Sequence, residues 1–154
     1  MNVDLMELAD CGSPERLITS ILNANPDLKI PVPIELLAAA VGISEIRRAP
    51  TESFEGSLLT NPEKSIGVIV LNAASRPERQ RFTIGHEIAH FLIPTHTGNA
   101  RCATSDLSIL AGDDSSGRRE AEANRFASGI LMPAPYFRQD IARLGSQMYA
   151  AVTN

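Results

Sequence analysis

The segment RFTIGHEIAHFLI, residues 81–93, is apolar on nearly every side and also carries two histidines and a glutamate. Pro77 suits the first turn of a helix and Pro94 cannot continue one, so the sequence predicts a helix that begins at Pro77 and stops before Pro94. Because its apolar side chains point in almost every direction, this helix must be buried. Three titratable side chains on a buried helix need a structural or functional reason.

The spacing of these side chains indicates a metal site. His86 and His90 are four residues apart, so on a helix they share one face, with their Cβ atoms about 6 Å apart. Two imidazoles placed in this way can both bind one Zn²⁺, each at about 2.0–2.1 Å. Glu87 lies ~100° further round the helix, where it can reach a water on the open side of the metal. The HExxH pattern therefore predicts His86 and His90 as ligands and Glu87 as the catalytic base of a hydrolase.

The alternative is a buried helix whose histidines hydrogen-bond only to backbone groups. Desolvation of two histidines and a glutamate is costly unless a partner satisfies them, and a metal satisfies all three at once. The chain has only three histidines, and two of them fall in this pattern. Metal binding is the favoured interpretation.

A catalytic zinc needs a third protein ligand, and helical geometry selects among the downstream carboxylates. The segment from Arg118 to Met132 has helical periodicity. Glu120 lies about 50° from the centre of its apolar stripe, whereas Glu122 lies about 110° away. We therefore predict Glu120 as the third ligand and place Glu122 in a surface charge ladder with Arg118 and Arg125. The other candidates were Asp106, Asp113 and Asp114.

Two further expectations concern this helix. Asn124 is one turn beyond Glu120, where it can hydrogen-bond a ligand imidazole. The competing interpretation of Glu120 is a simple ion pair with Arg119 or Arg81.

The rest of the chain predicts a single domain over residues 1–154, with a helical N-terminal segment over about 1–50 and a catalytic core over about 51–145. Ser13 and Pro14 mark the start of one helix, and a second runs from about Pro33 to Val41 and ends at Gly42. Residues 53–60 and 65–72 flank the turn NPEK as a β-hairpin. A long loop follows from Pro94 to Gly117, and a last helix covers about 135–144, before a frayed tail.

Composition disfavours several classes of protein. A formal net charge of −4 gives no basic field for nucleic acid, and no apolar run is long enough to cross a membrane. Cys11 and Cys102 form no CxxC pair and imply no disulfide framework, which fits the cytoplasm. The segment LLAAAVGISEIRRAP resembles half of a helix-turn-helix, but Pro50 would cut the recognition helix short, so DNA binding is disfavoured.

Two stretches together resemble a known family. RFTIGHEIAHFLI, followed about thirty residues later by REAEANRFASGILMP, resembles the ImmA/IrrE family of bacterial metallopeptidases, and PVPIELLAAAVGI and FEGSLL also resemble that family. The resemblance implies a small zincin-like α+β fold with a twisted sheet packed on the HExxH helix. It implies Zn²⁺ held by His86, His90 and Glu120, with Glu87 catalytic.

The resemblance also implies a function, namely cleavage of a cytoplasmic helix-turn-helix repressor after stress or during mobile-element induction. The composition predicts no direct contact to nucleic acid or membrane. An extended substrate is expected to pair with an exposed edge of the hairpin sheet. The residue that stabilises the oxyanion is left open among His96, Tyr136 and Arg118. The alternative function is a metal-binding module that docks onto a transcription regulator without cutting it.

Overall fold

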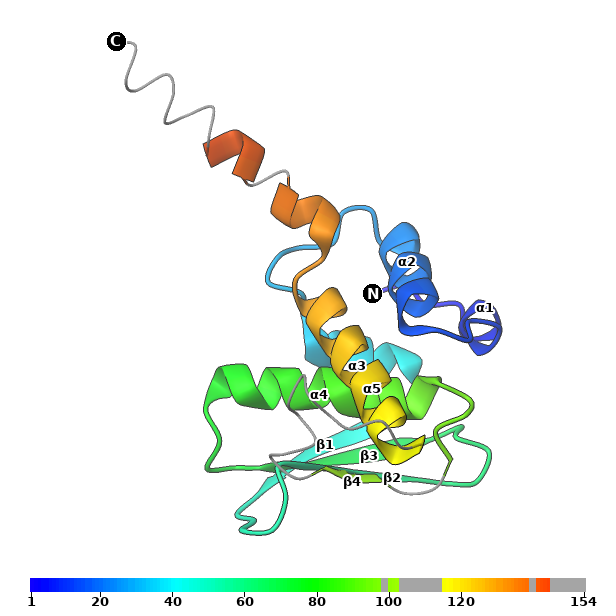
Figure 1. The fold of residues 1–154 in the computed structure, drawn as a ribbon, viewed down its shortest axis with the longest axis vertical. Helices are drawn as coiled ribbons and strands as arrows, with labels where there is room; N and C mark the ends of the chain where they lie inside the picture. Colours follow the sequence, from blue (N-terminus) through cyan, green and yellow to red (C-terminus); the bar gives the residue numbers. More distant parts are fainter. Residues whose placement is uncertain (98–99, 103–114, 139–140, 145–154) are drawn as a thin grey trace.

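The computed structural model describes residues 1–97, 100–102, 115–138 and 141–144. Its helices and strands follow in the order α1 (Leu5–Ala9), α2 (Pro14–Ala24), α3 (Ile34–Val41), β1 (Ile43–Ala49), β2 (Gly56–Thr60), β3 (Gly67–Asn72), α4 (Pro77–Leu92), β4 (Ala100–Cys102) and α5 (Ser115–Leu131). Short helical turns cover 134–138 and 141–144 and extend away from the sheet (Figure 1). The predicted α+β class is confirmed.

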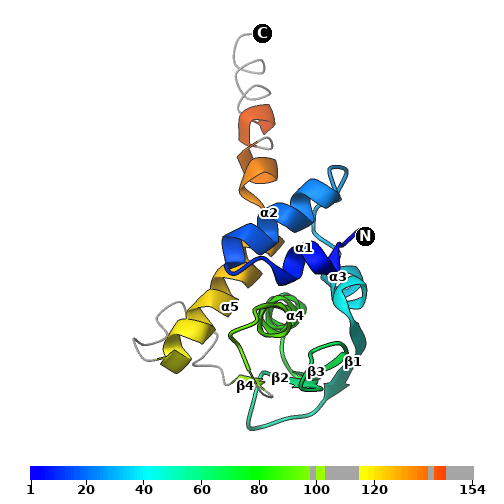
Figure 2. The ribbon, with the colours of Figure 1, turned by 90° about the vertical axis from the view of Figure 1, so that its right-hand side faces the viewer.

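The HExxH helix α4 forms the centre of the molecule. Viewed along its axis in Figure 2, it has the sheet on one side, α5 on another, α3 opposite α5, and α1 and α2 over the remaining side. Residues 83–91 of α4 are all buried. This arrangement explains why the segment is apolar nearly all round, since every face of the helix meets another element.

The sheet has four strands in the order β1-β3-β2-β4. β2 and β3 pair antiparallel around residues 61–66, so the predicted hairpin is confirmed. β3 alternates buried and half-buried positions, and its buried residues Ile69 and Leu71 belong to the same core as Ile84 and Ile88 of α4. This period of two is the signature of a strand with one face against the core.

One sequence-based expectation about this part of the chain was wrong. The N-terminal 50 residues are not helical throughout, because residues 43–49 form β1, which pairs parallel with β3. This strand occupies the position of the would-be recognition helix, so the helix-turn-helix resemblance does not hold. Neither strand of the hairpin is an edge, because β1 flanks β3 and β4 flanks β2. Within the described sheet, the edges are β1 and β4.

Local signals explain the ends of the helices. The Ser13 hydroxyl accepts a hydrogen bond from the backbone N–H of Arg16 and caps α2, with Pro14 as its first residue. Gly42 ends α3 with φ of 110°, a left-handed conformation that glycine adopts without steric penalty. The β1 strand then begins at Ile43. A sharp end to α3 thus directs the chain into the sheet.

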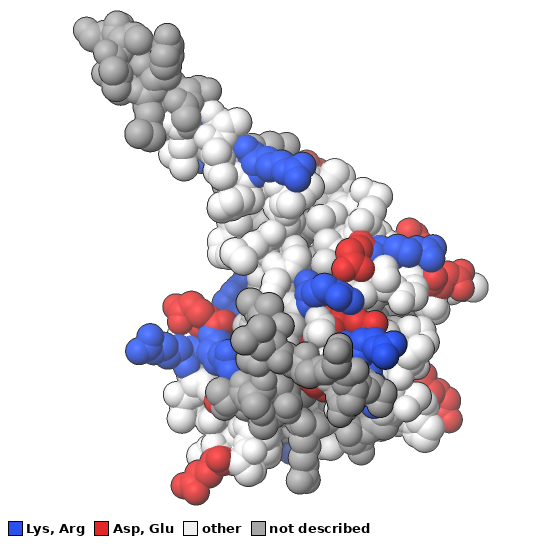
Figure 3. Space-filling view, viewed as in Figure 1, with Lys and Arg blue, Asp and Glu red and all other residues white. Residues whose placement is uncertain are grey.

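No helix in the described part of the chain is both long enough and apolar enough to span a membrane. On the face shown in Figure 3, basic and acidic side chains are interspersed. Most of the predicted Pro94–Gly117 loop lies outside the described residues, as does the tail after residue 144.

Candidate metal centre

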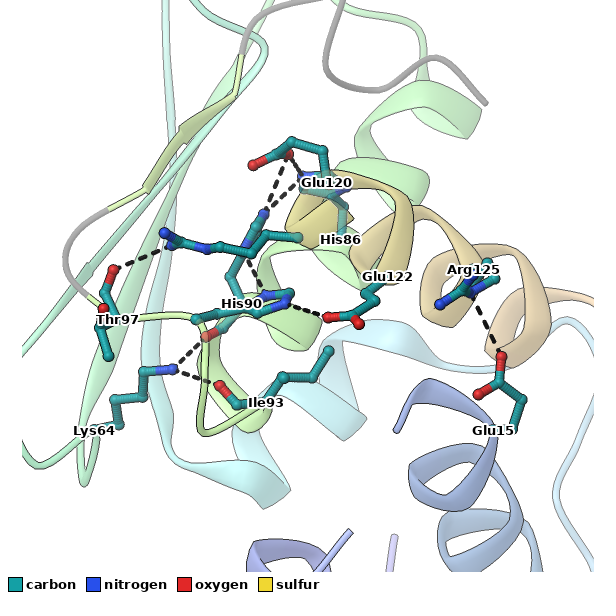
Figure 4. Close-up of polar contacts among 11 residues, drawn as sticks. Glu15, Lys64, His86, His90, Ile93, Thr97, Glu120, Glu122 and Arg125 are labelled. Carbon is teal, nitrogen blue, oxygen red and sulfur yellow. Dashed lines mark hydrogen bonds and ion pairs between the residues drawn. The ribbon is translucent and has the colours of Figure 1, made fainter. Parts of the chain in front are cut away.

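Two helices supply the candidate metal ligands. α4 carries His86 and His90 on one face, and α5 crosses it with Glu120 directed toward both imidazoles (Figure 4). The helices approach closely where Gly85 meets Ala127, since a Cβ at position 85 would lie only 3.3 Å from the Ala127 Cα. Close packing at this point brings the first turns of α5 over the ligand face of α4.

Three ligand atoms converge at this crossing. The His86 Nε2 lies 3.0 Å from the Glu120 Oε2 and 3.1 Å from the His90 Nε2, and the His90 Nε2 lies 3.4 Å from the Glu120 Oε2. Ligands that hold a tetrahedral zinc at about 2.0–2.1 Å are separated from one another by about 3.3 Å. The observed separations, 3.0–3.4 Å, are close to the edges of such a tetrahedron.

The hydrogen bonds and pKa shifts around the three ligand atoms also suit a bound cation. The His86 Nδ1 lies 2.9 Å from the Asn124 Oδ1, which accepts its proton and leaves the Nε2 lone pair directed at the cluster. Burial lowers the pKa of His90, although Glu120 opposes the shift. Burial alone would raise the pKa of Glu120, but its contacts with the rings of His86 and His90 outweigh burial and lower this pKa. Two imidazole nitrogens and a carboxylate oxygen thus face one point, and this is a set of ligand atoms that a divalent metal can use.

Glu87 lies between α4 and the sheet. Its side chain is fully buried. Opposite it on β2 is Gly56, where a Cβ would come within 2.7 Å of the Glu87 Oε1 and 2.3 Å of the Thr83 Cγ2. The carboxylate is therefore accommodated beside the strand because residue 56 has no side chain.

Asn124 occupies the expected position beside the cluster, whereas Glu122 does not occupy the exposed position expected of it. The Glu122 Oε2 lies 2.9 Å from the His96 Nε2, and its side chain is 27% exposed. Arg125, expected as its surface partner, instead lies 3.5 Å from Glu15 of α2. The surface charge ladder predicted for this helix was therefore wrong.

The arginines proposed as simple partners of Glu120 have other contacts. Arg81 donates to the Val32 carbonyl and lies 4.0 Å from Glu35. Arg119 donates to the Thr97 carbonyl at 3.1 Å. Asp106, Asp113 and Asp114 lie outside the described residues.

The three oxyanion candidates lie in different surroundings. His96 is buried on the far side of His90 from the ligand atoms, with its Nδ1 3.0 Å from the His90 Nδ1. Burial lowers the pKa of His96 to about 4, against the influence of Glu122. The Tyr136 hydroxyl donates to the Pro26 carbonyl, between α2 and α3. Arg118 is exposed and stays a candidate.

Residues 40–151 match the sequence profile of the Peptidase_M78 family, described as the IrrE N-terminal-like domain. The chain belongs to this family. The resemblance inferred from its two helices is thereby confirmed. The chain is 33% identical over 115 residues to the radiation response metalloprotease IrrE of Deinococcus radiodurans, an alignment that covers 71% of this chain and 31% of the relative. It is 36% identical over 83 residues to the protein of the same name from Deinococcus deserti, covering 51% and 27%. The matched part of the chain thus spans less than a third of the length of each of these relatives.

Proposed function

We propose that this chain is a zinc-dependent endopeptidase. The observation that carries the proposal is the convergence of His86, His90 and Glu120, whose ligand atoms all lie within 4.8 Å of one another. Membership of a metallopeptidase family and the name of the Deinococcus relatives support the same reaction class. Zinc is the metal of choice for two imidazoles and one carboxylate in a tetrahedral site that leaves one position open.

In the proposed reaction, some residues would hold the metal and another would transfer the proton. His86, His90 and Glu120 would hold the metal, and Asn124 would fix the ring of His86. A bound Zn²⁺ supplies a Lewis acid that makes water a competent nucleophile near neutral pH. Glu87 would accept a proton from the attacking water and pass it to the amine of the departing peptide segment.

The sheet edge nearest to Glu87 suits an extended substrate. β4 pairs with β2 from Gly56 to Leu58, so among the described strands the outer side of β4 is a sheet edge, close to the strand that faces Glu87. A peptide that adds to this edge gains backbone hydrogen bonds irrespective of its sequence, and neighbouring pockets would supply selectivity. We propose a cytoplasmic helix-turn-helix repressor as the physiological substrate, cleaved in a stress response, as the family resemblance implies.

A Glu87→Gln variant tests the proposed reaction. This variant should retain the metal and lose hydrolysis, because an amide cannot act as the base. The matched control is Glu78→Gln, which alters an exposed glutamate on the same helix. The zinc-loaded proteins are incubated with the helix-turn-helix regulator encoded beside the gene, and fragments are identified by mass spectrometry. Normal cleavage by Glu87→Gln would overturn the mechanism. Metal binding and stable docking without fragments would favour the non-cleaving module instead.

A further inference from the structure

A line of three side chains leads away from the ligand cluster. The His90 Nδ1 lies 3.0 Å from the His96 Nδ1, and the His96 Nε2 lies 2.9 Å from the Glu122 Oε2. The side chains of His90 and His96 are 2% and 0% exposed. Shielding from water strengthens such hydrogen bonds and restricts the positions of the rings.

Metal binding would fix the direction of every hydrogen bond in this line. A metal at the His90 Nε2 takes the lone pair of that atom, so the proton of His90 resides on Nδ1 and is donated to the His96 Nδ1. The His96 Nδ1 must then be an acceptor, so the proton of His96 is on Nε2 and is donated to Glu122. The opposite direction would place a proton on the His90 Nε2, where the metal belongs. With a metal on His90, both hydrogen bonds can therefore form only if protons are donated from His90 to His96 and from His96 to Glu122.

The segment that carries His96 is held in place at several points. The His96 backbone N–H donates to the Ile93 carbonyl at 3.1 Å. The Lys64 Nζ, from the turn before β3, donates to the carbonyls of His90 and Ile93 at 2.7 and 2.9 Å. Arg119 of α5 donates to the next residue, Thr97. The position of the His96 ring is thus determined by both the sheet and α5.

We propose that His96 and Glu122 are positioning residues that orient His90 and fix its tautomer for metal binding. The inference rests on the proposed function, because it assumes that His90 is a metal ligand. The two ligand histidines are then supported differently, His86 by the neutral amide of Asn124 and His90 by a carboxylate acting through a second imidazole. His96 and Glu122 are not part of any cluster of three or more metal-binding side chains in the described regions of the chain.

Loss of such support typically weakens metal affinity 10- to 100-fold. The test uses two variants at each position. Glu122→Leu removes the acceptor, whereas Glu122→Gln retains a carbonyl oxygen of similar reach. His96→Leu removes both hydrogen bonds, whereas the His96→Gln amide can accept from His90 and donate to Glu122. Glu15→Gln is the matched control, because Glu15 is an exposed carboxylate whose partner Arg125 lies on the same helix as Glu122.

Two measurements follow, the Zn²⁺ dissociation constant by competition with a chelating dye and the visible spectrum of the Co²⁺-substituted protein. We expect the leucine variants to bind Zn²⁺ at least 10-fold more weakly, with an altered Co²⁺ spectrum. The amide variants should recover part of the affinity, and Glu15→Gln should match wild type. Unfolding is monitored without metal. If a leucine variant does not fold, Glu122→Gln and His96→Gln decide the outcome: a partial loss of affinity with an altered Co²⁺ spectrum supports the positioning role, and wild-type affinity with a wild-type spectrum overturns it.

Affinities within 2-fold of wild type together with unchanged Co²⁺ spectra would overturn the positioning role while leaving the metal site intact. Equal losses of stability with and without metal, at constant affinity, would show a structural role only and would also overturn it. Failure of the wild-type protein itself to bind Zn²⁺ is a different result, because it removes the proposed function.

Discussion

Replacement of Gly56 by alanine tests whether the position of Glu87 depends on a missing side chain. A Cβ at this position would lie 2.3 Å from the Thr83 Cγ2 and 2.7 Å from the Glu87 Oε1. Ordinary contacts between carbon atoms are about 3.5 Å or longer. The Thr83 methyl group would have to move by more than 1 Å, and the carboxylate by a substantial fraction of that. β2 cannot easily retreat, because β3 and β4 pair with it at residue 56.

Gly56→Ala is expected to affect both the stability of the protein and its turnover. Overpacking of this kind destabilises a protein by about 1–3 kcal/mol. A displacement of a catalytic group by about 1 Å can reduce turnover about 100-fold. The ligands His86, His90 and Glu120 make no close contact with the added methyl group, as judged from its nearest neighbours. Metal affinity should therefore change by less than about 3-fold, while turnover falls.

The assay separates these effects with a second substitution. Thr83→Ser removes the Cγ2 but keeps the hydroxyl that donates to the Arg79 carbonyl. The double variant Gly56→Ala/Thr83→Ser should therefore recover stability in urea without recovering turnover of a quenched-fluorescent peptide selected from a library. Gly12→Ala is the control, since a Cβ there meets no atom within 4 Å. Wild-type turnover in Gly56→Ala, or full rescue by Thr83→Ser, would refute the proposed constraint on Glu87.

Two further predictions concern stability. Lys64→Met should lower the free energy of unfolding by about 1–3 kcal/mol, because it removes two charge-assisted hydrogen bonds at the C-terminal end of α4. Chemical denaturation measures this change, with Lys29→Met, at an exposed lysine, as the control. Equal effects of the two substitutions would contradict the prediction. The metal-free protein should also lose stability as the pH falls from about 6.5 towards 4. Burial lowers the pKa of His96 to about 4 in the folded state, so the unfolded chain takes up the proton first. The loss from this residue is on the order of 2 kcal/mol after solvent screening, and His96→Gln should flatten the profile; an unchanged pH profile would argue against it.

The sequence predicted the features that depend on local periodicity. α4 begins at Pro77 and ends before Pro94, and α3 ends at Gly42, because prolines and glycines act within one or two residues of themselves. Glu120 was placed by its angle from the apolar stripe of α5, and the structure brings it to His86 and His90. These predictions needed no knowledge of distant parts of the chain.

The features that sequence reasoning missed depend on partners far along the chain. β1 exists because β3 pairs with it in parallel, and its residues contain no periodicity that separates a strand from a short helix. Glu122 looked exposed on its own helix, but it meets His96 across 26 residues of sequence. α1 was missed although a local signal was present, since the Asp4 side chain accepts from the backbone N–H groups of Met6 and Glu7.

The most direct test of the central claim is the metal content of the purified protein, measured by elemental analysis after dialysis against metal-free buffer. We expect about one zinc per wild-type chain, the same content in the Glu45→Gln control, and much less in Glu120→Ala. Glu45 is a suitable control because its carboxylate pairs with Arg47 on the exposed surface of β1. A wild-type chain without bound metal, or a Glu120→Ala variant that retains its full metal content, would contradict the proposed metal site.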